Sequence, residues 1–371
     1  MPIIFLSPLV NFIKNEYAGL PVVQPARSQA GNFSLPPGLV KVEFKELWIR
    51  TKQDVWLAEF AYAIEPEINM SIRPIKRLIK AKPTREGAGV HLRRAFGFGN
   101  TSEFDPFLLL DDFRNDIPED YLAGFPWHPH RGIETITYVL AGTVEHGDSL
   151  GNQGAISPGD IQWMTAGRGI VHQEMPKGDK LGQMHGFQLW ANLPSSLKMT
   201  APRYQEIKAA EIPEITDDDG THARVICGNF WGKKGPVEGI ASDPSYLDVT
   251  LPPGKRKKLA VEISRHAFAY VFAGSGKFCN ASGPLAVPTE GVGWSDTTPP
   301  READNRSLVL FDSGDEVEVQ AGEDGIRFLL VSGKPLEEPV AWYGPIVMNT
   351  QEQLRQAFEE LQEGTFLKSG T

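Results

Sequence analysis

Alternation of apolar and polar residues over short stretches dominates the chain from about residue 90 onward. The run IETITYVLAGTV, which begins at Ile133, places Glu134, Ile136 and Tyr138 on one face of an extended strand and Thr135 and Thr137 on the other. Segments rich in turn-forming residues, such as HGDSLGNQG, SPGD and LPPGK, separate runs of this kind. Many short strands joined by tight turns predict an all-β fold of the barrel or sandwich type.

A short internal repeat predicts two copies of one β-barrel unit. The string TYVLAG, which ends at Gly142, recurs as AYVFAG, which ends at Gly274. A Gly-Asp pair that opens a strand at Gly159 recurs at Gly314. Near the end of the chain, Thr350 and Gln353 fit a capping box followed by an apolar stripe, which predicts a closing helix.

Residues 1–69 differ from the rest of the chain, because they show several prolines and no sustained period of two or 3.6. We interpret them as an appended N-terminal extension. Two explanations stay open: a real extension that is poorly ordered, or an artefact of a gene model that begins too early, with Met70 as the internal start.

Composition narrows the partners and the compartment. The 371 residues include 37 Lys and Arg against 47 Asp and Glu, a net charge of -10 that disfavours direct contact with nucleic acid or anionic lipid. No apolar stretch is long enough to span a membrane, and Pro8 interrupts the apolar N-terminal run. Two cysteines, Cys227 and Cys279, form neither a disulfide framework nor a thiolate metal cage. We therefore expect a cytoplasmic protein, or a nuclear one if the source is eukaryotic.

Two pairs of candidate metal ligands stand out. His128 and His130 are spaced i and i+2, which points both imidazoles to the same face of a strand, and His172 and Glu174 repeat this spacing. Three imidazoles and one carboxylate suit a first-row ion such as Fe, Ni, Cu, Mn or Zn. Glu134 keeps the same parity as the first pair. An octahedral ion would retain open positions for a substrate, whereas a four-coordinate zinc would be closed and structural.

The strings around these residues resemble a known family. FPWHPHRGIETITYVLAGTVEHGDSLGNQG and GDIQWMTAGRGIVHQEMP are similar to the two metal motifs of the cupin superfamily in the form found in pirins, and KPLEEPVAWYGPIVMNT resembles the C-terminal signature of that family. The resemblance, from about Ile72 to Phe366, implies a bicupin: two stacked antiparallel β-barrels of the jelly-roll type that face each other. We therefore expect an N-terminal cupin barrel over 70–200 and a C-terminal one with the closing helix over 201–371.

The resemblance also implies one iron per chain, held in the N-terminal barrel by His128, His130, His172 and Glu174, with other first-row divalent metals as alternatives. Glu134 stands where many other cupins keep a glutamate ligand, so we expect it beside the ligands. Alignment of the repeat places Ala260, Glu262 and His266 at the positions of His128, His130 and Glu134, and it places Arg327 and Leu329 at those of His172 and Glu174. The second barrel is therefore predicted to be metal-free.

Three functions share this metal motif. Resemblance to pirins implies an oxygenase of the quercetin 2,3-dioxygenase type, which opens a flavonol-like aromatic substrate with O2 and uses Glu174 or Glu134 as the base. The alternative is an iron-dependent, redox-sensing transcriptional co-regulator that acts through a protein partner. A third reading is a stress-related metal-binding protein with a small ligand. The sequence alone leaves the choice open, because the motif does not report turnover.

Overall fold

The computed structural model describes residues 41–50, 55–64, 70–278 and 302–367, and the chain splits into two compact units, Met1–Asn69 and Met70–Thr371. In the first unit, β1 (Lys41–Arg50) pairs antiparallel with β2 (Val55–Ile64). The sequence pattern did not predict these strands, because apolar residues occupy both parities of VWLAEFAYAI and hide the alternation. The origin of residues 1–69 stays a prediction.

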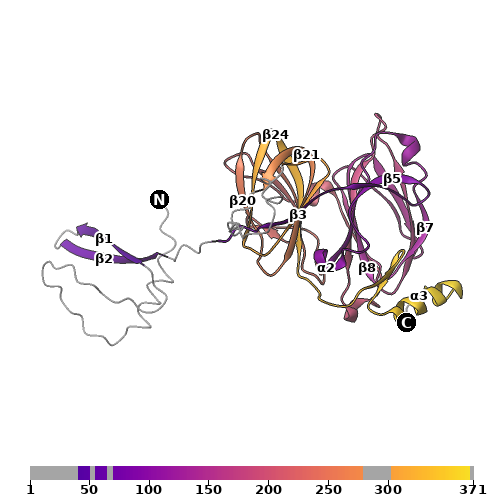
Figure 1. Cartoon of the computed structure of the whole chain (residues 1–371). Helices are drawn as coiled ribbons and strands as arrows, with labels where there is room; N and C mark the ends of the chain where they lie inside the picture. Colours follow the sequence, from indigo (N-terminus) through magenta and orange to yellow (C-terminus); the bar gives the residue numbers. More distant parts are fainter. Residues whose placement is uncertain (1–40, 51–54, 65–69, 279–301, 368–371) are drawn as a thin grey trace, which may run out of the picture. The chain divides into compact units, whose positions relative to one another are not determined.

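The N-terminal half of the second unit consists of two antiparallel sheets. Figure 1 shows β8 and β7, one from each sheet, on opposite sides of this half. The seven-stranded sheet contains β4 (Lys82–Glu86), β5 (Val90–Phe96), β6 (Phe107–Asp112), β8 (Ile133–Ala141), β11 (Ile161–Thr165), β13 (His185–Asn192) and β14 (Arg203–Ile207) in the order β14-β11-β8-β13-β6-β5-β4. The four-stranded sheet has the order β10-β9-β12-β7 and contains β7 (Phe125–His130), β9 (Thr143–Asp148), β10 (Gln153–Ile156) and β12 (Ile170–Lys177).

The C-terminal half is a nine-stranded sheet with the order β15-β16-β19-β24-β21-β23-β3, to which β20 and β22 add at β24 and β21. Its strands are β3 (Ile75–Lys80), β15 (Glu214–Thr216), β16 (His222–Cys227), β19 (Ser245–Leu251), β20 (Arg256–Ala260), β21 (His266–Phe278), β22 (Ala303–Asp304), β23 (Ser307–Phe311) and β24 (Glu316–Gly333). The remaining elements are the hairpins β17 (Asn229–Phe230) with β18 (Lys233–Lys234) and β25 (Ala341–Tyr343) with β26 (Ile346–Met348), the helices α2 (Thr101–Phe104) and α3 (Gln351–Gln362), and 3-10 turns at Pro118–Asp120, Ser195–Leu197 and Ala209–Glu211.

The all-β fold with a short C-terminal helix is thus confirmed, although the halves are cupin-like sheets and not closed barrels. The capping box is present, since the Gln353 amide donates to Thr350 Oγ1 at 3.2 Å and the Thr350 amide donates to Gln353 Oε1 at 3.2 Å. On β8 the structure differs from simple alternation, because Thr135 and Thr137 are as buried as Ile136 and Tyr138. Both faces of this strand are covered: one by the C-terminal half and the other by the interior of its own half.

One apolar core joins the two halves. It combines buried side chains of the N-terminal half, such as Trp163 and Phe187, with side chains of the C-terminal half, such as Tyr246 and Phe268. Trp163 is 1% exposed and belongs to this core, so it packs between the sheets and does not line a cavity wall. Burial of this shared surface stabilises the pair of halves as one unit.

Two tyrosines at equivalent positions of the repeat lock this core. Tyr138 donates its hydroxyl to Asp248 Oδ2 of the C-terminal half at 2.7 Å, and Tyr270 donates to Asp112 Oδ2 of the N-terminal half at 2.8 Å. Burial raises the pKa of both hydroxyls above the usual tyrosine value, so both stay protonated donors. Each half therefore supplies a donor to a buried carboxylate of the other.

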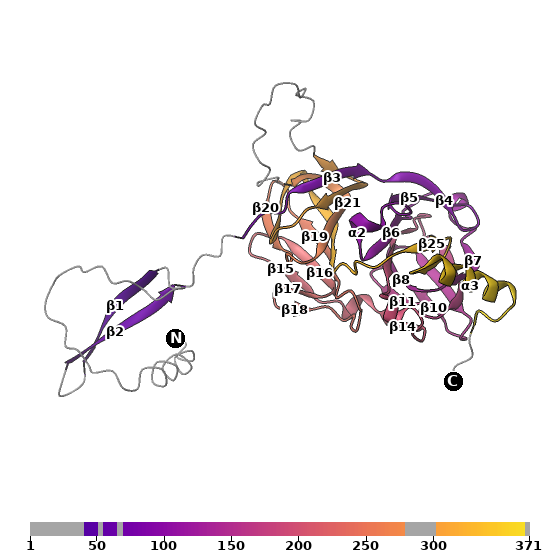
Figure 2. The ribbon, with the colours of Figure 1, turned by 60° about the horizontal axis from the view of Figure 1, so that its bottom comes forward.

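The terminal segments of the second unit cross between its halves. Strand β3, which precedes the N-terminal half in sequence, pairs with β23 of the nine-stranded sheet. At the other end, Ile346 of β26 forms a bridge with Arg131, which follows β7, and Figure 2 shows α3 beside β7. Each end of the unit therefore contacts the opposite half, and the division into barrels over 70–200 and 201–371 stays a prediction.

We predict that a chain beginning at Met70 folds and keeps its metal site, because every apolar core cluster of the described residues lies between Ile72 and Phe366. A chain beginning at Ala81 is the matched comparison, since it lacks β3 and the buried Arg73, whose Nη1 and Nη2 donate to Asp312 O and Glu262 O. Its thermal midpoint is expected to fall by roughly 10 °C or more. Thermal unfolding followed by circular dichroism checks both; an equal loss in the two chains would contradict the prediction.

Candidate metal centre

Three histidines converge between two neighbouring strands. His128 and His130 lie on β7 with their side chains on the same face, and His172 of β12 pairs directly with His128 across the ladder. One ring nitrogen from each histidine lies within 4.8 Å of the others. The period of two along a strand, together with the antiparallel register, brings the three side chains together.

The hydrogen bonds of two rings fix their protonation. His128 Nδ1 is 2.8 Å from Pro126 O, and His130 Nδ1 is 3.1 Å from Pro345 O. Because a carbonyl oxygen only accepts, each Nδ1 carries a proton, and in the neutral ring Nε2 then presents a lone pair. These two Nε2 atoms lie 3.1 Å apart. Two facing lone pairs repel each other unless a cation binds between them, so this arrangement fits a metal ion.

Burial keeps His130 and His172 neutral. It lowers the pKa of His130 and of His172 well below the usual histidine value, and the neighbouring histidines lower both further. Both ring nitrogens of His172 are buried without a hydrogen-bond partner among the described residues. Neutral imidazoles with free lone pairs are what a divalent first-row ion requires. The donor set therefore fits the metal predicted from the sequence.

Glu174 lies on β12 on the same side as His172, but the structure holds it apart from the three-histidine group. Its carboxylate accepts from Thr137 Oγ1 at 3.1 Å and from Gln188 Nε2 at 3.1 and 3.3 Å. Trp190 Nε1 in turn donates to Gln188 Oε1 at 3.1 Å, which fixes the orientation of the amide. The role of Glu174 as a fourth ligand stays a prediction.

Glu134 lies away from the histidines, which differs from the sequence expectation. It is buried on β8, accepts from Thr165 Oγ1 at 2.7 Å, and shares its face of the strand with Ile136 and Tyr138. Burial raises the pKa of its carboxyl. The parity argument failed because Gly132, with φ of 77°, turns the chain between β7 and β8, so the alternation of one strand does not continue into the other.

A cavity of about 520 Å³ opens directly on the centre. His128 and His130 lie in its wall together with Gln188, Arg94 and Asp111, and its aromatic lining consists of Phe98, Phe125, Trp190 and Trp342. Arg94 Nε and Nη2 donate to the two oxygens of Asp111 at 2.8 and 2.7 Å, and burial raises the pKa of Asp111 to about 6. No motif in the sequence predicted that Asp111 and Phe98 would line this cavity. Trp342 and Pro345, in contrast, lie in the C-terminal string that resembles the family signature.

The C-terminal segment fixes the position of β7, the strand that carries His128 and His130. Besides the Pro345 carbonyl on His130, the buried Arg131 donates to Glu360 Oε2 at 2.8 Å and to Phe366 O at 2.9 Å. Lys198, also buried, donates to Gly132 O at 2.8 Å and to Val347 O at 3.0 Å. These contacts fix both sides of the turn that follows His130.

At the equivalent positions of the C-terminal half, other interactions occupy the side chains. Arg327 Nε and Nη2 donate to Asp248 at 2.9 and 2.7 Å. Arg265 Nε donates to Glu262 Oε2 at 2.9 Å, and His266 Nδ1 is 2.7 Å from Asp105 O. That this half is metal-free stays a prediction.

The fold and the three-histidine centre define a bicupin with a candidate metal site in its N-terminal half. Family models agree: residues 89–191 match Pirin and residues 246–367 match the Pirin C-terminal cupin domain. The chain belongs to the pirin family. A pirin-like protein of Caulobacter vibrioides is 46% identical over 298 residues, which cover 80% of this chain and 100% of that protein.

Two solved structures share the fold. A quercetin 2,3-dioxygenase from Acinetobacter baumannii has a TM-score of 0.69 and 30% identity, covering 80% of this chain and 99% of its own. A bacterial pirin from Escherichia coli, in complex with nickel(II), has a TM-score of 0.51 and 20% identity, covering 70% of this chain and 98% of its own. In the described part of this chain, no helix has the length and apolar character needed to cross a membrane.

We predict that His128→Ala and His172→Ala each lower the bound metal from one ion per chain to less than a tenth, because each removes one of three converging imidazoles. His222→Ala is the matched control, since His222 pairs with Glu214 on the C-terminal half. Elemental analysis of the purified proteins, with thermal unfolding to establish folding, checks the prediction. Full metal content in either of the first two variants would show that the ligand assignment is wrong.

Proposed function

We propose that this protein is an iron-dependent dioxygenase of the quercetin 2,3-dioxygenase type, which opens a flavonol-like aromatic substrate with O2. One observation carries the proposal: two imidazoles of the metal centre, those of His128 and His130, lie in the wall of a 520 Å³ cavity that four aromatic side chains also line. The name of the Acinetobacter relative supports the same chemistry. We assign iron as the resident metal because the resemblance to pirins implies it and imidazole donors suit it, as they suit the other first-row ions.

The cavity suits a flat, hydroxylated ring system. Its volume lies in the range of small-molecule pockets. Trp190 stacks edge-on against His130, with ring centres 5.1 Å apart, and lies 6.0 Å from Trp342, so aromatic faces lead up to the centre. Such walls bind an aromatic substrate through burial and ring contacts. Arg94 and Asp111 add a polar edge that orients hydroxyl groups.

The metal, when bound, would act as a Lewis acid that makes a substrate hydroxyl easier to deprotonate. We assign Glu174 as the base that accepts that proton, because it is buried, lies two residues from His172 on β12, and is bonded to Gln188 of the cavity wall. Thr137 and Gln188 hold the carboxylate in position through hydrogen bonds. Glu134 has no access to the cavity and is left out of the mechanism.

We predict that Glu174→Gln lowers kcat/KM for quercetin by roughly 100-fold or more, since a carboxamide does not accept the proton. Glu134→Gln is the matched control and is expected to stay within about threefold of the wild type, because the new side chain still accepts from Thr165. The measurement is oxygen consumption by the iron-loaded proteins with quercetin, with iron content determined for each.

Loss of iron in Glu174→Gln would assign that residue to ligation instead of proton transfer. A wild-type protein that holds one iron per chain and consumes no oxygen with quercetin would contradict the proposed function. Activity lost in Glu134→Gln but kept in Glu174→Gln would contradict the assignment of the base.

A further inference from the structure

A second and larger cavity lies away from the metal centre. Its volume is about 760 Å³, and it shares no lining residue with the metal cavity. It lies where β4, β5 and the segment after β6 approach the turn between β22 and β23 of the C-terminal half. We call it the cationic cleft, because its lining includes Arg85, Arg93, Arg114 and Arg306 together with His91 and His185.

The strand period explains how the two cavities share the same pair of strands. Arg93 pairs with Asp112, and Arg94 pairs with Asp111, in the register of β5 with β6. Successive residues point to opposite faces, so Arg94 and Asp111 line the metal cavity while Arg93 lies in the cationic cleft. On the neighbouring strand, Arg85 pairs with His91, which brings it to the same face as Arg93.

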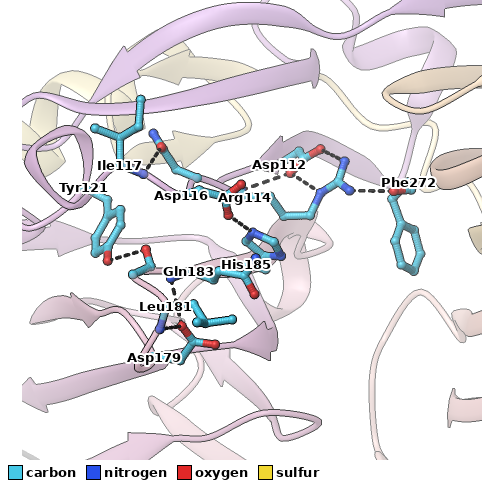
Figure 3. Close-up of polar contacts among 12 residues, drawn as sticks. Asp112, Arg114, Asp116, Ile117, Tyr121, Asp179, Leu181, Gln183, His185 and Phe272 are labelled. Carbon is cyan, nitrogen blue, oxygen red and sulfur yellow. Dashed lines mark hydrogen bonds and ion pairs between the residues drawn. The ribbon is translucent and has the colours of Figure 1, made fainter.

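The positive charges of the cleft exceed the carboxylates that face them. Asp112 is buried and accepts from Arg114 Nε at 2.8 Å, and its other oxygen lies 3.9 Å from Arg306 Nε. Figure 3 shows Arg114 held between Asp112 and the Phe272 carbonyl, and His185 directed at Asp116. Among the described residues of the lining, Asp116 is the only carboxylate, 2.6 Å from His185, and Asp120 lies 3.0 Å from His91.

Two of the arginines have no partner at all within the part of the chain that the structure describes. Arg85 is exposed and Arg93 is half-buried, and neither guanidinium group forms a hydrogen bond or an ion pair with another described residue. Two unpaired guanidinium groups on the same face of neighbouring strands repel each other. In a chain with a net charge of -10, such a concentration of positive charge is a local feature and not a property of the whole surface.

The opposite wall is built at a conformational cost. Arg306 has φ of 68°, a left-handed conformation that residues other than glycine rarely adopt. The turn is held there by the Arg306 amide, which donates to Val271 O at 2.7 Å, and by the Ala81 amide, which donates to Arg306 O at 2.9 Å. A strained arginine where glycine would be relaxed indicates that its side chain has a use in the cleft.

We propose that the cationic cleft binds a small metabolite that carries two or more anionic groups, phosphate or carboxylate. Guanidinium groups match both anions in geometry. The charges come from two walls, Arg85 and Arg93 on the strands and Arg306 on the turn, so one ligand with separated anionic groups engages both. The volume admits a molecule of that size.

Binding of two probes to the iron-loaded protein tests this proposal. Fructose 1,6-bisphosphate supplies two separated phosphates and tricarballylate supplies three carboxylates, and each is titrated by calorimetry at constant ionic strength. We expect saturable binding of at least one probe, and the preferred probe identifies the anion type. We expect the double variant Arg85→Gln/Arg93→Gln to weaken it at least about tenfold, while Arg256→Gln, which removes a charge from the exposed strand β20, leaves it unchanged.

Arg306→Gly provides a second variant, which is expected to fold because glycine adopts the left-handed conformation without strain. It is expected to keep the thermal midpoint and iron content of the wild type while it weakens probe binding at least about tenfold. Equal affinity in the wild type and both cleft variants would overturn the proposal, because it would place the probe at the metal or on the general surface. Absence of saturable binding by either probe would overturn it as well.

Discussion

Reciprocal hydrogen bonds between the two repeats are the constraint on which the rest of the structure depends. Tyr138 and Tyr270 occupy the same position of the repeated string, and each donates to a buried aspartate of the opposite half. Each aspartate also accepts from an arginine of its own half, Arg114 or Arg327, so each half depends on the other for the tyrosine donor that completes this buried pair. The exchange of β3 and of the C-terminal segment strengthens the same dependence.

The hydrogen bonds between the halves also set the positions of the metal cavity and the cationic cleft. Asp112 accepts from Tyr270 and from Arg114, which fixes β6 against the C-terminal half. The next residue back, Asp111, then faces the metal cavity and pairs with Arg94. The metal cavity and the cationic cleft therefore lie on opposite faces of one pair of strands, and the register that sets one also sets the other.

The part of the site that could be predicted from the sequence is the part set by local geometry. His128, His130 and His172 meet because a strand has a period of two and because β7 pairs with β12. Glu134 was misplaced because parity does not survive the turn at Gly132, and Glu174 lies on the predicted face but outside the histidine group. Local pattern reports which face a residue takes, but it does not report what packs against that face.

Contacts between segments that lie far apart in the sequence could not be predicted from local patterns. The cationic cleft needs Arg93 and Arg306 to meet across two halves, and the Pro345 carbonyl reaches His130 from 215 residues further along the chain. The strands β1 and β2 were missed for a different reason, since their apolar residues occupy both parities. The fold class, by contrast, followed from turns, alternation and the repeat, which agree with one another.

The central claim is that the three converging imidazoles hold one metal ion beside the aromatic cavity. Anomalous X-ray scattering at the iron edge, from crystals of the iron-loaded protein, tests it most directly. The account predicts one strong peak per chain, between the Nε2 atoms of His128 and His130 and within bonding distance of His172. A peak at any other place in the chain, or none in a protein that holds iron, would contradict it.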